Sequence, residues 1–197
     1  MRKATLLHIL IISFVFLLAA TASYAGAIEN SKERVRNNPD DVEAHYWLGF
    51  DYFMVGKYEE AIESYKQAIR INPDYVDAHR SIGLAYALLG SNATQFKYKS
   101  LLFKEAIESY KHAIRIDPDP KDAVGIGSCY GELGMYQEEI ESYKQAIRID
   151  PDYALAYYGL GDTYLRLNDR GSAMEQYKIL KKLDTELANE LFNKIYK

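Results

Sequence analysis

The chain has 197 residues, with 24 Lys and Arg against 28 Asp and Glu, and its formal net charge is −4. This acidic balance argues against a nucleic-acid-binding protein, because phosphates require clustered positive charge. The single cysteine excludes an internal disulfide, so the fold has to be stabilised by packing.

The first 25 residues have the layout of a secretory signal peptide. Two basic residues precede a mostly apolar run from Ala4 to Ala20, and small residues follow, with Ser23 and Ala25 placed for cleavage. The run is shorter than the roughly 20 residues that a spanning helix needs. We therefore expect export to the periplasm, the cell envelope or the extracellular space. The alternative is an uncleaved N-terminal membrane anchor, and membrane contact is expected only in that case.

One twelve-residue motif occurs three times in the sequence, twice with small changes. ESYKQAIRINPD begins at Glu63, and close variants begin at Glu108 and Glu141. An apolar residue followed by Gly, with Tyr three residues later, recurs four times at spacings of 34, 44 and 34 residues; the glycines are Gly49, Gly83, Gly127 and Gly161. Fixed periods in this range are typical of stacked repeat proteins.

Each repeat is predicted to be a pair of helices. In the first repeat, apolar residues at steps of three and four predict a leading helix from Val42 to Val55, which Gly56 ends. The same spacing predicts a trailing helix from Tyr58 to about Ile71, which ends before Pro73. The predicted fold class is therefore all-α.

Four such repeats follow an N-terminal segment, residues 26–41, part of which is predicted to form a short cap. The repeats span residues 42–75, 76–119, 120–153 and 154–186. The second contains an insertion, residues 91–101, which is expected to separate its leading helix from its trailing helix. Residues 187–197 are predicted to form a capping helix at the C-terminal end.

Residues 42–75 resemble a near-complete tetratricopeptide repeat, with matches at Leu48, Gly49, Tyr52, Gly56, Tyr58, Ala61, Tyr65, Ala68 and Pro73. The resemblance extends over residues 42–186. It implies a right-handed α-solenoid of about four stacked helix-turn-helix repeats with a C-terminal capping helix.

The third repeat departs from this pattern. Its leading helix contains Gly125, Gly127 and Gly131, and since glycine disfavours helix we expect this helix to be the least stable of the stack. Glu139 stands where the family usually has a small Ala. In the insertion, Asn92 begins an Asn-Ala-Thr glycosylation acceptor, which matters only if the source organism glycosylates exported proteins.

No catalytic or metal-binding constellation stands out in the sequence. His45 and His79 occupy equivalent places in adjacent repeats, where the family packs a bulky side chain, and His112 replaces a surface Gln. Cys129 lies within a predicted helix and is expected to be a buried thiol. We therefore predict a protein that is not an enzyme and has no cofactor and no metal site.

In the family that this chain resembles, the leading helices line a concave groove that receives a peptide or helix of a partner. The resemblance places in that groove Tyr46, Phe50, Phe53, Met54, Arg80, Leu84, Leu88, Lys121, Tyr158, Asp162, Leu165 and Arg166. The alternative for Phe50, Phe53 and Met54 is that the chain's own N-terminal cap or terminal helix covers them. Only Lys121 matches the carboxylate clamp of the family's chaperone-binding subtype, so that subtype is not expected.

These features lead to two hypotheses about function. The first is a non-catalytic scaffold that binds a protein or peptide partner in its groove. The second is an accessory or assembly subunit that positions a cell-envelope enzyme or a secretion complex. Direct catalysis would need a nucleophile or metal cluster that the sequence does not supply.

Overall fold

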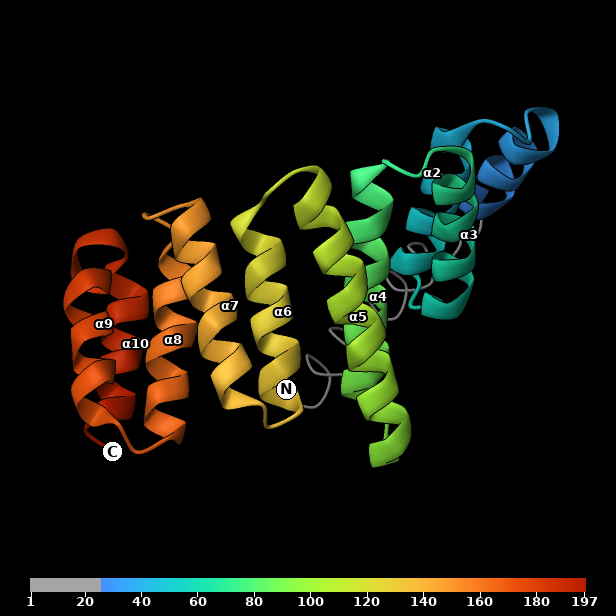
Figure 1. The fold of residues 1–197 in the computed structure, drawn as a ribbon. Helices are drawn as coiled ribbons and strands as arrows, with labels where there is room; N and C mark the ends of the chain where they lie inside the picture. Colours follow the sequence, from blue (N-terminus) through green and yellow to red (C-terminus); the bar gives the residue numbers. More distant parts are fainter. Residues whose placement is uncertain (1–25) are drawn as a thin grey trace, which may run out of the picture. The chain divides into compact units, whose positions relative to one another are not determined.

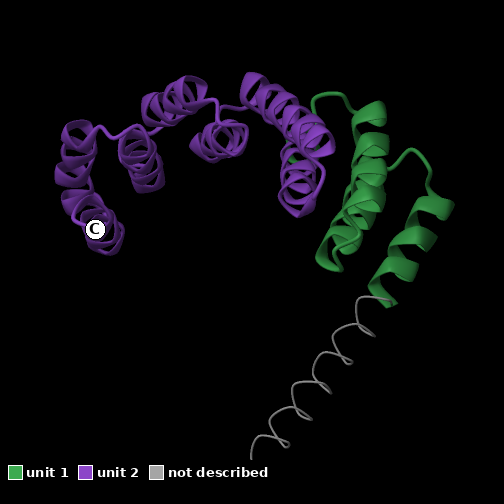
Figure 2. Cartoon of the chain, turned by 90° about the horizontal axis from the view of Figure 1, so that it is seen from below, with its two compact units in different colours: residues 1–78 green, residues 79–197 purple. Residues whose placement is uncertain are grey.

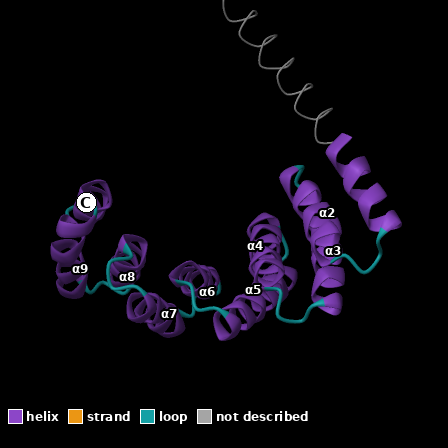
Figure 3. Cartoon of the chain, turned by 90° about the horizontal axis from the view of Figure 1, so that it is seen from above, coloured by secondary structure: helices purple, strands orange, loops and turns teal. Residues whose placement is uncertain are grey.

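The computed structural model describes residues 26–197, and within this range every regular element is a helix (Figures 1 and 3). The predicted signal peptide, residues 1–25, lies outside the described residues. No helix within residues 26–197 has both the length and the apolar character needed to cross a membrane. The all-α solenoid expected from the sequence is confirmed.

A helix over residues 26–37 comes first. The further helices are α2 (Val42–Met54), α3 (Tyr58–Ile71), α4 (Val76–Asn92), α5 (Phe96–Ile116), α6 (Pro120–Glu132), α7 (Tyr136–Ile149), α8 (Ala154–Arg166), α9 (Arg170–Leu183) and α10 (Thr185–Ile195).

Aspartates begin several of these helices by binding backbone N–H groups that the first turn leaves unpaired. The Asp41 carboxylate accepts from the N–H of Ala44 at the start of α2. Asp119 and Asp169 do the same for α6 and α9. Asp184 accepts from two N–H groups at the start of α10. Local sequence therefore fixes where these helices begin.

The described residues form two compact units, 26–78 (unit 1) and 79–197 (unit 2) (Figure 2). In unit 1, α2 packs against α3 around Tyr65, which is buried. A Cβ atom at Gly49 would lie 2.6 Å from the Tyr65 ring and 3.1 Å from the carbonyl oxygen of Ala61. The predicted close approach at Gly49 is confirmed, with the Tyr65 ring as the nearer neighbour.

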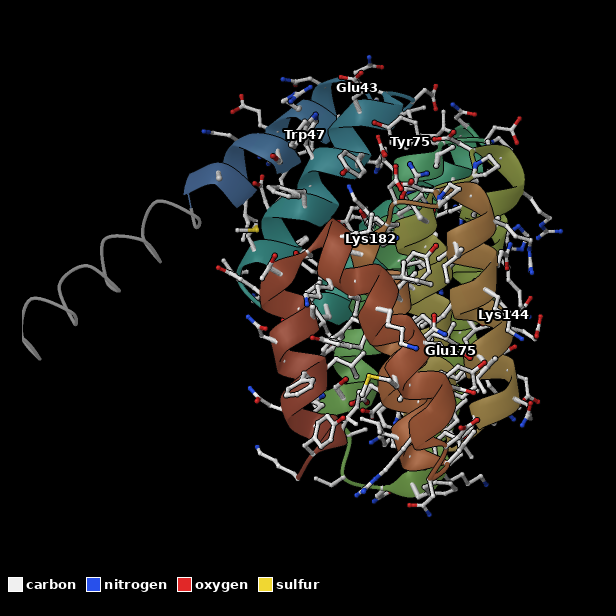
Figure 4. All side chains as sticks on the ribbon, turned by 90° about the vertical axis from the view of Figure 1, so that its left-hand side faces the viewer. Glu43, Trp47, Tyr75, Lys144, Glu175 and Lys182 are labelled. Carbon is white, nitrogen blue, oxygen red and sulfur yellow. The ribbon has the colours of Figure 1, made fainter. Side chains whose placement is uncertain are left out.

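In unit 2 the leading helices α4, α6 and α8, followed by the terminal helix α10, form one row, and the trailing helices α5, α7 and α9 form a second row (Figure 3). The two rows curve together, with the leading helices on the inner side. Phe103, Leu180 and Leu191 are buried between the rows. On the outside of the trailing helices lie Lys144 of α7 and Glu175 and Lys182 of α9 (Figure 4).

The insertion in the second repeat lengthens both helices, and it also contains the turn that separates them. α4 has 17 residues where α2, α6 and α8 have 13, and α5 has 21 where α3, α7 and α9 have 14. Gly90, at the place of Gly56, continues the helix instead of turning the chain, and the Phe103 ring lies 3.1 Å from where its Cβ would be. The chain turns later, at residues 93–95.

Candidate functional site

Unit 1 presents an exposed apolar surface on α2, which we call the α2 stripe: Trp47, Phe50 and Met54. Their exposed fractions are 43%, 37% and 44%. Steps of three and four residues place them on one face of the helix. The Trp47 and Phe50 rings meet edge to face with centroids 5.5 Å apart, and Trp47 lies at the surface of α2 (Figure 4). Exposed aromatic residues of this kind are typical anchors of protein interfaces.

The two other predicted groove residues of α2 are half-buried. Tyr46 packs among Trp47, Tyr65 and Tyr75, with ring centroids 5.4 to 5.5 Å apart. Phe53 packs against Tyr58 at 5.3 Å. Both therefore support the α2 stripe more than they extend it.

The N-terminal helix does not cover the stripe. Its Ser31 hydroxyl is 2.5 Å from Oδ2 of Asp51, to which it donates a hydrogen bond, so residues 26–37 do pack beside α2. Phe50 and Met54 nevertheless keep the exposure given above. Within residues 26–78 the cap therefore leaves Phe50 and Met54 exposed, while Phe53 is half-buried. Trp47 belongs to the same surface, although the family pattern did not assign it to the groove. Its position three residues before Phe50 places both side chains on one helix face, and this spacing could have identified it from the sequence.

In the second repeat, Leu84 is exposed at 44% and Leu88 is half-buried. Arg80 makes hydrogen bonds within the chain. Its Nε donates to Oδ2 of Asp122 at 2.8 Å, and its Nη2 donates to the backbone oxygen of Asp117 at 2.9 Å. These bonds tie α4 to α6 and to the turn before it. Lys121, in the first turn of α6, is exposed.

The predicted groove residues of the fourth repeat contact the terminal helix α10. The Tyr158 hydroxyl donates to the Glu190 carboxylate, and the Lys194 ammonium lies 4.9 Å from the Tyr158 ring centroid. Lys194 also donates to Oδ1 of Asp162 at 2.7 Å. Leu165 is half-buried. In this part of unit 2 the capping helix therefore binds the polar groups of Tyr158 and Asp162 that were predicted to face a partner.

Arg166, the last predicted groove residue, pairs with a buried carboxylate. Glu139 is fully buried, and its Oε1 accepts from Nη2 of Arg166 at 2.5 Å. Its Oε2 has no hydrogen-bond partner within residues 26–197. Burial raises the pKa of Glu139, although Arg166 acts in the opposite direction. Gly131 provides the room, because a Cβ there would lie 2.7 Å from Oε1 of Glu139.

The histidines and the cysteine lie in structural surroundings. His79 and His112 stack with ring centroids 5.3 Å apart, a contact between side chains that the sequence did not connect. Burial and Arg115 lower the pKa of His112. Burial raises the pKa of Cys129 to about 12, as expected for a buried thiol. The described part of the chain brings together no group of three or more His, Cys, Asp or Glu residues able to hold a metal ion.

Two models of one protein family match the chain. A model described as TPR repeat matches residues 51–90 and 127–168, and one described as tetratricopeptide repeat matches residues 102–120 and 154–186. Together the matches cover more than half of the 197 residues. A search of curated proteins gives no match.

Several solved structures share the fold. A structure of MamA has a TM-score of 0.73 and 23% identity, covering 87% of this chain and 94% of its own. TTC0263, a thermophilic TPR protein of Thermus thermophilus, has a TM-score of 0.68 and 24% identity, covering 92% and 95%. YrrB, described as a TPR protein with an unusual peptide-binding site, has a TM-score of 0.67 and 22% identity, covering 92% and 90%. The repeats, their helix pairs and the two matching models show that the chain belongs to the tetratricopeptide repeat family.

Proposed function

We propose that the chain is a non-catalytic scaffold that captures a peptide or helix of a partner protein on the α2 stripe. The observation that carries this proposal is the exposure of Trp47, Phe50 and Met54 on one face of a leading helix. Apolar side chains of this size, held by packed neighbours, can bury area in a partner while losing little conformational entropy. The peptide-binding site for which YrrB is described supports such a use of the fold.

The test is selection of a displayed peptide library on the immobilised chain, followed by affinity measurements with the selected peptides. Phe50→Asp should weaken binding by at least about 30-fold, as expected when an interface anchor worth about 2 kcal/mol is lost. Ile179→Asp is the matched control, because Ile179 is exposed at 38% but lies on the trailing helix α9. Both variants should keep the circular dichroism of the parent. A folded Phe50→Asp variant that binds the peptides as tightly as the parent would reject the α2 stripe as the site.

The proposed site of action is outside the cytoplasm, and this rests on the signal-like composition of residues 1–25. Mass spectrometry of the N-terminal peptide from cells should find a chain that begins after Ala25. A chain that retains residues 4–20 would instead support the membrane anchor. If the captured partner were an envelope enzyme, the same surface would serve to position it.

A further inference from the structure

The longer helices of the second repeat create a surface that the other repeats lack. α5 begins seven residues earlier, relative to its repeat, than the trailing helices of 14 residues, and the added residues are Phe96–Leu102. At 1.5 Å per residue they add about 10 Å to the helix. Figure 1 shows this end of α5 reaching beyond the neighbouring ends of α6 and α7. We call residues 96–102 the α5 extension.

The α5 extension exposes large apolar side chains. The exposed fractions are 74% for Phe96, 49% for Tyr98 and 53% for Leu101. They surround an open depression of about 550 Å³ that is completed by Gln95, Lys97, Ser100 and Lys104. All of these residues come from one helix and the residue before it. Apolar and basic side chains at a projecting helix end can reach the interface of a lipid bilayer.

The charge around the α5 extension differs from that of the whole chain. No Asp or Glu occurs from Ala78 to Lys104, although 28 of the 197 residues are acidic. The first turn of α5 has no acidic side chain, while α3 and α7 each have two there. Lys97 and Lys104 line the depression, whereas Lys99 pairs with Glu132 at 2.7 Å. An acidic protein therefore presents a locally basic and aromatic surface.

We propose that the α5 extension is a contact site for an anionic lipid bilayer. The projecting end of α5 is directed at the bilayer, because Phe96 and Tyr98 lie on opposite sides of the helix. Phe96, Tyr98 and Leu101 then insert into the interface between headgroups and acyl chains, where aromatic rings are favoured. Lys97 and Lys104 lie along this surface and can reach lipid phosphates with their ammonium groups while their methylene chains stay apolar. This contact goes beyond the α2 stripe, and it does not require residues 1–25.

The test needs a local readout, because residues 4–20 can bind a bilayer on their own. An environment-sensitive fluorophore is attached to the full chain through Gln95→Cys, which lines the depression but leaves the apolar side chains intact. The native Cys129 is buried and does not compete for the label. Glu175→Cys, on the outside of α9, is the control position (Figure 4). Emission and quenching by spin-labelled lipid are measured with phosphatidylcholine vesicles that contain or lack phosphatidylglycerol.

We expect a blue shift and lipid quenching at position 95 with phosphatidylglycerol vesicles, and neither at position 175. Replacing Lys97 and Lys104 with Gln should weaken the contact roughly 25-fold, because each lysine near an anionic surface contributes about fivefold. Deletion of residues 91–101, with the label moved to Lys104→Cys, should remove the lipid signal; circular dichroism checks the fold of both variants.

Three results would overturn the proposal. The first is an equal signal at positions 95 and 175, and the second is an equal signal with and without phosphatidylglycerol. The third is an emission shift at position 95 that appears with polyglutamate, or with a second, unlabelled copy of the chain, but not with vesicles. That result would assign the α5 extension to a protein contact.

Discussion

Gly131 and Glu139 fill one space in the third repeat, and their substitutions should therefore be strongly coupled. A methyl group at Gly131 would lie 2.7 Å from Oε1 and 2.9 Å from Cδ of Glu139. The carboxylate cannot move aside freely, because it is fully buried and its Oε1 is held by Arg166. Gly131→Ala should destabilise the parent chain and should stabilise a chain that already carries Glu139→Ala.

The expected magnitudes follow from these contacts. In the parent, Gly131→Ala gains about 1 kcal/mol in helix propensity but displaces a charged hydrogen bond worth about 1.5–3 kcal/mol, for a net loss of about 0.5–2 kcal/mol. In the Glu139→Ala background the obstacle is absent, so the same change should gain about 1 kcal/mol. The coupling energy is then about 1.5–3 kcal/mol. Glu139→Ala alone should change stability by about 1 kcal/mol or less, because Arg166 is partly exposed and keeps Asp162 within 3.4 Å.

The assay is urea denaturation of the parent, the two single variants and the double variant, followed by circular dichroism. Since repeat proteins can unfold in segments, amide exchange in α6 and α7 should accompany it. Gly171→Ala is the control: a Cβ there meets only Asp169, at an ordinary 3.5 Å, so its effect should be the same with and without Glu139→Ala. If Gly131→Ala has effects in the two backgrounds that agree within about 0.5 kcal/mol, the explanation of the Gly131 and Glu139 pair is wrong.

Two further predictions concern pH and the insertion. Burial raises the pKa of Glu139 above its ordinary value of 4.5, so the folded chain binds this proton more tightly than the unfolded chain does. The free energy of unfolding of the parent, relative to that of Glu139→Gln, should therefore fall as the pH rises from about 4.5 to the raised pKa. A difference between the two unfolding free energies that stays constant across this pH range would contradict the prediction. Deletion of residues 91–101 joins Gly90 to Leu102 and restores a Gly-x-aromatic turn like that at Gly56, so stability should change by no more than about 1–2 kcal/mol; loss of cooperative unfolding would show that the longer helices are required.

The fold could be predicted from the sequence because its determinants are local and repeated. Apolar residues at helical spacing recur with a fixed period, and Gly56 and Gly134 turn the chain with φ of +76° and +71°. The same reasoning did not show that most of the insertion extends the two helices beside it. Gly90 stands where those glycines do, but the turn at residues 93–95 contains no residue with positive φ and so gives no such signal. The helical Gly90 packs against the Phe103 ring, which lies 3.1 Å from where a Cβ of Gly90 would be.

The candidate site was less predictable, because the family pattern identifies positions on leading helices but not the partners of their side chains. Arg80 binds Asp122, 42 residues away, and Asp162 binds Lys194, 32 residues away. Neither separation has a signal in helical periodicity. The exposure of Phe50 and Met54 likewise depended on where residues 26–37 pack, which the sequence left open.

The polar side chains on the leading helices of unit 2 bind mainly to the next helices of the stack. Arg80 of α4 pairs with α6, and Asp162 of α8 pairs with α10. Asp122 is almost fully buried, so loss of Arg80 would leave an unpaired carboxylate in the interior and destabilise the stack. Substitutions at these positions would therefore lower partner binding through stability, whether or not a partner touches them. The α2 stripe contributes no charged group to such pairs, since its three side chains are apolar, which is why the decisive binding test uses Phe50.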